Sequence, residues 1–124
     1  MKKILFTVLL VVAFLEISAQ MSIDISVGGD IDKFYPVTFS DKEWNNHLPT
    51  EIFIGRSSVH IDSDWRGSTI AKFEYHMTNW GNGSAFINAM IYSSHPFIAG
   101  WKDATSAGSN WIIIWLRGGG TTYR

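Results

Sequence analysis

Several side chains that could bind a metal ion or transfer protons lie close together in the middle of the chain. His60, Asp62 and Asp64 alternate with apolar residues, so they share one face of an extended segment. A three-residue hairpin loop at Arg66–Ser68 would place His60 opposite Glu74 and Asp62 opposite Lys72. Histidines with carboxylates can hold a metal ion or act as general acid and base. The polar surface predicted in this way comprises His60, Asp62, Asp64, Glu74 and His76.

A simpler interpretation of this surface is a solvated sheet face with ion pairs, and we favour it because alternation alone produces such faces. Asp62 and Asp64 lack the glycine and the distal glutamate of a calcium loop. The chain has no nucleophile elbow and no His-Glu-x-x-His motif. We therefore expect no catalytic residue, no metal site and no cofactor. The alternative is a small secreted hydrolase that uses His60 or His76 with a carboxylate.

A second candidate site lies in the turn-rich stretch Thr78–Ser84, where Trp80 stands between Asn79 and Asn82. An indole face stacks on the C–H groups of a sugar while amides bond its hydroxyls. Trp44-Asn45-Asn46-His47 has the same composition, and each Trp could instead fold back onto the core. We predict that Arg66 pairs with an acidic ligand group. The predicted ligand contacts are Trp80, Asn79 and Asn82, followed by His60, Asp62, Asp64 and Arg66.

The elements that must position these residues are short strands. After residue 20, β-branched and aromatic runs alternate with Gly, Asn, Ser and Pro clusters, and no useful helical periodicity occurs. Asp41–Asn46 is compatible with one short helical turn. The predicted strands lie near Ser22–Val27, Lys33–Phe39, Glu51–Ile54, Ser57–Ile61, Thr69–Thr78, Ala85–Ser93, Phe97–Trp101 and Trp111–Arg117.

The alternation of side chains predicts how these strands are covered. Ala71, Phe73, Tyr75 and Met77 share an apolar face, opposite a face with Lys72, Glu74 and His76. Ala85–Tyr92 and Trp111–Leu116 are apolar on both faces, which predicts central strands or strands where two sheets meet. We expect Trp111 and Trp115 in the core. Two packed antiparallel sheets accommodate both kinds of strand, so we predict an all-β, antiparallel β-sandwich or jelly-roll-like single domain over residues 20–124.

Residues 1–19 have the form of a secretory signal peptide. Lys2 and Lys3 precede an apolar run over Ile4–Leu15, and the small residue Ala19 follows Glu16. The run is shorter than the roughly 20 apolar residues that span a bilayer, so cleavage after Ala19 is preferred over a retained anchor. We expect this segment to be a helix that packs against nothing. The protein is then secreted, periplasmic or at the cell surface, without membrane contact after cleavage.

Composition excludes several classes of function. Without the signal peptide the chain has eight basic and ten acidic residues and a formal charge of −2. This balance does not suit a phosphate backbone, so no nucleic-acid partner is expected. The absence of cysteine excludes thiol catalysis, thiolate metal sites and disulfides, and packing must stabilise the fold. The final Thr121–Arg124 either closes the sheet as the last strand or marks a point where the sequence has been cut.

Several short motifs are spread along the chain after the signal peptide. They are Asp32–Val37, Arg56–His60, Trp65–Ser68, Ala71–His76, Asn79-Trp80-Gly81 and Trp115–Tyr123. Together they resemble the C-terminal receptor-recognition modules of phage tail fibres and shufflon-type pilus-tip adhesins, and the resemblance extends over residues 28–124. It implies a β-rich module that binds a cell-surface glycan or a similar receptor, and it supplies no catalytic residues.

The chain departs from this family in two ways. It has a signal peptide, for which a phage fibre assembled in the cytoplasm has no use, and it lacks a long stem through which to form trimers. We therefore predict a cell's own exported, non-catalytic binding module, with a glycan or cell-surface receptor as its partner and a homo-oligomer as an open possibility. The alternatives are the secreted hydrolase and a structural or assembly subunit.

Overall fold

The computed structural model describes residues 21–57, 66–77, 85–104 and 110–124. The predicted signal peptide lies outside these residues, and none of the described residues forms a helix long and apolar enough to span a membrane. A single 3-10 turn, Trp44–Asn46, occurs in the described ranges, where the sequence predicts a short helical turn. The strands are β1 (Ile25–Val27), β2 (Phe34–Ser40), β3 (Thr50–Arg56), β4 (Thr69–His76), β5 (Phe86–Ser93), β6 (Ile98–Asp103), β7 (Trp111–Arg117) and β8 (Thr121–Tyr123).

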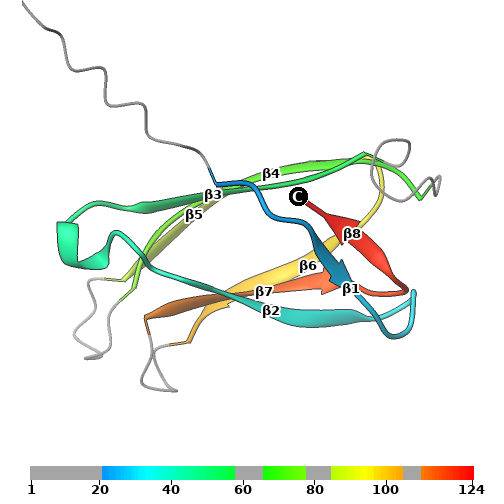
Figure 1. Cartoon of the computed structure of the whole chain (residues 1–124), viewed down its shortest axis with the longest axis horizontal. Helices are drawn as coiled ribbons and strands as arrows, with labels where there is room; N and C mark the ends of the chain where they lie inside the picture. Colours follow the sequence, from blue (N-terminus) through cyan, green and yellow to red (C-terminus); the bar gives the residue numbers. More distant parts are fainter. Residues whose placement is uncertain (1–20, 58–65, 78–84, 105–109) are drawn as a thin grey trace, which may run out of the picture.

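The strands form antiparallel sheets that pack on one another. One sheet has the order β3-β4-β5 and the other β2-β7-β6, while β1 and β8 form a two-stranded sheet. Figure 1 shows the two three-stranded sheets as facing layers, with β1 and β8 toward one end. The prediction of an all-β antiparallel sandwich is confirmed. The segment after the triple glycine is a strand, β8, which pairs with β1.

The core lies between the two larger sheets, where alternation sends every second side chain inward. Phe73 and Tyr75 of β4 are fully buried, as are Ile112 and Ile114 of β7. The Tyr75 hydroxyl donates a hydrogen bond to the Ser40 carbonyl at 2.9 Å, which satisfies the polar end of a buried ring. The predicted apolar face of β4 is therefore the core face, and its polar face points outward.

The β3–β4 pairing differs from the predicted hairpin. Glu74 lies opposite Glu51, and Lys72 lies opposite Phe53. The predicted pairs of Glu74 with His60 and of Lys72 with Asp62 are therefore wrong on this side of β4. On its other side β4 pairs with β5, where Glu74 meets Asn88 and Lys72 meets Met90.

The prediction of a three-residue hairpin loop at Arg66–Ser68 is also wrong. β3 ends at Arg56, which pairs with Thr69, so Arg66–Ser68 is the last part of a connection that begins at Ser57. The register follows burial, because Ile54 on β3 is 3% exposed and lies opposite the buried Ala71. Burial of an aliphatic side chain is worth about 1.5–3 kcal/mol. An exposed charge pair is worth about 0–1 kcal/mol, so matching charges is a weak guide to register.

The two strands that are apolar on both faces behave differently. β7 is central, between β2 and β6, as the sequence predicts. β5 is at an edge of its sheet within the described residues, so the prediction of a covered central strand is wrong for it. Phe86, Met90 and Tyr92 of β5 point outward and are exposed.

The tryptophans of β7 lie on the opposite face from the one predicted. Ile112, Ile114 and Leu116 fill the core, while Trp111 is 44% exposed and Trp115 is half-buried on the outer face. The assignment of both Trp residues to the core is therefore wrong. Both faces of β7 are apolar, and the slimmer aliphatic side chains pack between the layers at interior density.

Candidate functional site

The predicted ligand contacts attach to opposite ends of β4. Arg66 lies shortly before β4 begins at Thr69, and the Thr78–Ser84 stretch follows after β4 ends at His76. The eight residues of β4 extend over about 23 Å at the usual rise of a strand. Arg66 and the Thr78–Ser84 stretch therefore join the sheet at points far apart along β4. Six of these residues lie outside the described part of the chain: His60, Asp62, Asp64, Asn79, Trp80 and Asn82.

Arg66 is the predicted contact that the structure describes. Its Nη1 donates hydrogen bonds to the Gly119 carbonyl and to Thr121 Oγ1, both at 2.9 Å. This nitrogen fixes the turn between β7 and β8. Pairing of Arg66 with an acidic ligand would have to use the remaining guanidinium nitrogens.

The outward face of the β3-β4-β5 sheet is the most prominent surface of the described residues. It carries five large apolar side chains, each about half exposed or more: Phe53, Ile70, Phe86, Met90 and Tyr92. Several large apolar side chains exposed on one sheet face are a feature of interaction sites. We call this surface the β4 face. It comprises Glu51 and Phe53 of β3, Ile70, Lys72, Glu74 and His76 of β4, and Phe86, Asn88, Met90 and Tyr92 of β5.

Charged and polar groups stand at the centre of the β4 face. Lys72 Nζ lies 2.6 Å from Glu74 Oε1 and 3.1 Å from Glu51 Oε1. Asn88 Nδ2 donates to Glu74 Oε2 at 3.0 Å. The hydrogen bond from Lys72, followed by that from Asn88, lowers the pKa of Glu74 to about 2. At neutral pH the face therefore presents an ammonium group and carboxylates that hold one another in place.

One end of the β4 face is a stack of rings. The His76 ring lies 6.3 Å from Trp44, nearly parallel to it, and 6.0 Å from Phe86. His76 Nδ1 is 3.7 Å from Oδ2 of the buried Asp41. Asp41 accepts hydrogen bonds from Thr50 Oγ1 and, at 2.8 Å, from the Met77 amide. The stack is thus anchored to the core where the Thr78–Ser84 stretch begins.

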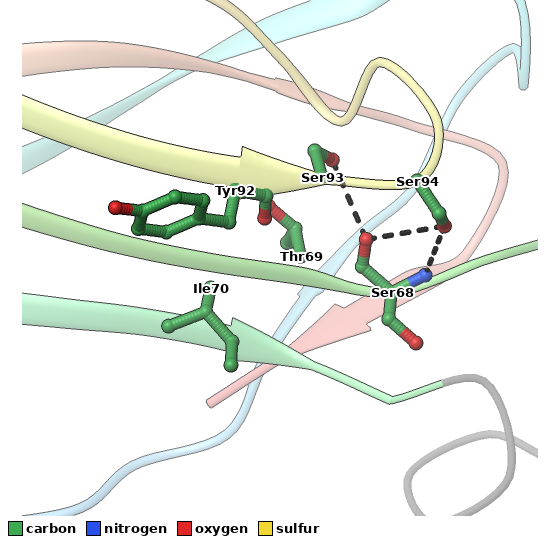
Figure 2. Close-up of a pocket in the computed structure, with 6 residues that line it drawn as sticks. All are labelled: Ser68, Thr69, Ile70, Tyr92, Ser93 and Ser94. Carbon is green, nitrogen blue, oxygen red and sulfur yellow. Dashed lines mark hydrogen bonds between the residues drawn. The ribbon is translucent and has the colours of Figure 1, made fainter.

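The other end of the β4 face holds a shallow pocket of about 250 Å³. Figure 2 shows the ring of Tyr92 and the side chain of Ile70 on one side of it and three serines on the other. Ser94 Oγ accepts a hydrogen bond from the Ser68 amide at 2.8 Å, which ties the end of β5 to the start of β4. The exposed lining of the pocket is almost entirely apolar, because the Ser93 and Ser94 hydroxyls hydrogen-bond the Ser68 carbonyl.

Sequence reasoning missed most of the β4 face. The apolar character of Ala85–Tyr92 on both sides was the available signal, but it indicates exposure as readily as burial. No group of three or more His, Asp or Glu side chains among the described residues could hold a metal ion. Comparisons with protein-family models, curated proteins and solved structures gave no match.

Proposed function

We propose that the protein is an exported, non-catalytic binding module that recognises a glycan or a similar receptor at a cell surface. The β4 face is the observation that carries the proposal, because it exposes five large apolar side chains around hydrogen-bonding groups. Sugar rings offer C–H faces that stack on aromatic rings and hydroxyls that bond amides and carboxylates. Tyr92 and Phe86 are the stacking residues, and Asn88 with Glu74 are the hydroxyl partners.

The charges on this face favour a neutral ligand over a polyanion. Lys72 is its one permanent cation, and it is already paired with Glu51 and Glu74. A phosphate polymer would meet two carboxylates and find no unpaired lysine or arginine on the described part of this face. The formal charge of the whole chain, −1 with neutral histidines, points the same way.

A glycan array with matched variants tests the proposal. Tyr92→Ala and Phe86→Ala each remove a stacking surface, and we expect each to weaken binding by about tenfold or more, as for a ring at the centre of an interface. Trp111→Ala is the control, since it removes an exposed ring of the opposite sheet. The proposal is wrong if no glycan binds, or if all three variants weaken binding equally.

The alternative of a small hydrolase has one supporting observation, the approach of His76 to Asp41. Both Asp41 carboxylate oxygens already accept hydrogen bonds from the fold, and the His76 ring is held between two aromatic rings. We therefore expect no turnover of chromogenic esters or glycosides. Turnover that disappears in His76→Gln, with the thermal unfolding temperature unchanged, would favour the hydrolase.

The exposed apolar side chains of the β4 face would also suit an assembly subunit. Light scattering during size-exclusion chromatography separates this alternative from the proposal. A glycan-binding monomer keeps one mass over a wide concentration range, whereas a subunit that buries the face associates as concentration rises.

A further inference from the structure

Within the described residues, the sandwich is open along the side formed by β2 and β3. A cleft of about 1370 Å³ runs between the two sheets there, lined by both strands and by the segment that precedes β1. β2 and β3 are edge strands of their sheets within the described residues. The cleft therefore borders two strand edges at once. Figure 1 shows β2 and β3 in the two facing layers.

Side chains that point toward the core are incompletely covered along this cleft. Phe39 lies opposite the buried Ile112, and Ile52 lies opposite the buried Phe73, yet both are only half-buried. Trp101 belongs to β6 of the facing sheet. Its ring packs edge-on against Phe73, with 5.4 Å between the ring centroids. Phe39 and Ile52 both line the cleft.

The backbone of β3 presents unpaired groups to the same cleft. The Gly55 amide donates to the Arg124 carbonyl at 2.6 Å, and the Arg124 amide donates back to the Gly55 carbonyl at 2.8 Å. Gly55 thus points its polar groups away from β4, and by alternation Phe53 and Glu51 do the same. No described backbone group pairs with Phe53 or Glu51 on that side.

The edge of β2 is less available. Pro36 of β2 lies at a position whose backbone groups point away from the partner strand β7, and proline has no N–H to donate. The Ser40 carbonyl already accepts the hydrogen bond of the Tyr75 hydroxyl. Of the two edges that border the cleft, β3 is therefore the one able to accept a further strand.

We propose that the cleft binds an extended segment of a partner polypeptide, which adds to β3 as an antiparallel strand. The segment would continue the pairing that Arg124 makes with Gly55 and would bond the backbone of Phe53 and Glu51. Its inward side chains would be apolar and would cover Ile52 and Phe39. Donors and acceptors that recur every second residue, about 6.8 Å apart, match a peptide backbone and match neither a fatty acid nor a sugar.

An array of synthetic peptides with apolar residues at alternate positions tests this inference. Peptides of the same composition with their apolar residues in one block are the control. Hydrogen exchange on the full chain then locates the binder. We expect the amides of Glu51 and Phe53 to become protected, while the Ile52 amide, which points toward β4, stays as it was.

A matched pair of variants separates backbone from side chain. Phe53→Pro removes the edge N–H without removing a bond to β4, and Phe53→Ala removes only the ring. We expect Phe53→Pro to bind the best peptide about tenfold more weakly than Phe53→Ala. If Phe53→Pro does not fold, the exchange pattern of the unmodified protein decides.

Three results would overturn the inference. One is the absence of binding by any alternating peptide at about 1 mM, the weak end of measurable affinity. Another is binding without protection of Glu51 and Phe53. The third is protection of these amides by self-association alone, which would identify a second copy of the chain as the occupant.

Discussion

Glu74 shows how single residues set the response of this protein to acid. Hydrogen bonds from Lys72 and then Asn88 lower its pKa from 4.5 to about 2. The folded-state pKa lies below the unfolded value, so the contribution to stability is complete above about pH 4.5. It is lost as the pH falls from there toward 2.

We predict that Glu74→Gln loses less stability than the unmodified protein over this pH range. Lys72→Met should have the same effect, because it removes the hydrogen bond that contributes most to the low pKa of Glu74. Urea unfolding at a series of pH values measures both. Parallel curves for the three proteins would show that Glu74 does not couple folding to acid.

At the scale of elements, the turn between β7 and β8 is a packed junction. The Gly118 amide donates to the Lys33 carbonyl at 2.9 Å, and Thr121 Oγ1 donates to the Gly118 carbonyl at 2.8 Å. Arg66 reaches the same turn from the β3–β4 connection. Gly118, Gly119 and Thr121, which belong to the Trp115–Tyr123 motif, therefore have a structural role in this turn.

Gly118→Ala tests this junction. A Cβ at Gly118 would overlap the Gly28 carbonyl oxygen and lie 2.8 Å from the Asp30 carbonyl oxygen, so backbone would have to move. We expect a loss of about 1–3 kcal/mol, the usual cost of overpacking. Gly100→Ala is the control, because a Cβ there meets nothing within 4 Å. Thermal unfolding compares them, and equal unfolding temperatures would contradict the prediction.

At the scale of the whole molecule, two buried tyrosines set an alkaline limit to stability. Burial raises the pKa of Tyr123 to about 12 and also raises that of Tyr75, which the charge of Asp41 raises further. Below pH 10 both phenols are protonated whether the chain is folded or unfolded. Above it the unfolded chain releases protons that the folded chain retains, so stability falls as the pH rises toward 12.

We predict that Tyr123→Phe loses less stability between pH 10 and 12 than the unmodified protein. It also removes the hydrogen bond to the Arg117 carbonyl, so its stability at neutral pH should be lower. Chemical unfolding at neutral and alkaline pH measures both effects. An unchanged alkaline slope would show that Tyr123 does not ionise on unfolding.

Much of the fold could be predicted because its signals are local. Ala71, Phe73 and Tyr75 alternate with Lys72 and Glu74, and a period of two residues marks a half-buried strand whatever lies around it. The structure of the Gly28–Asp32 segment is also local, since Gly29 has a φ of 80° and the Lys33 amide donates to the Asp30 carbonyl. Such features need only neighbours in the chain.

The candidate site could not be predicted in the same way. Tyr92 and Met90 lie on a strand whose residues are apolar on both faces, and they are exposed because no described layer covers the outer face of their sheet. Ile70 on the central strand β4 is exposed on the same face. Glu74 was expected opposite His60 and lies opposite Glu51 and Asn88. Strand order and register depend on residues far apart in the sequence, so matching charges along the chain does not identify them.

The sequence by itself determined the class of this protein: short strands with at least one apolar face each, no cysteine, and an N-terminal segment with the form of a signal peptide. The tertiary structure alone decided which face of β7 is inside and which strand edges are open. The physical reason is that burial is a property of packed layers. Trp111 and Ile112 are both apolar, and their places outside and inside the core follow from contacts with strands distant in the chain.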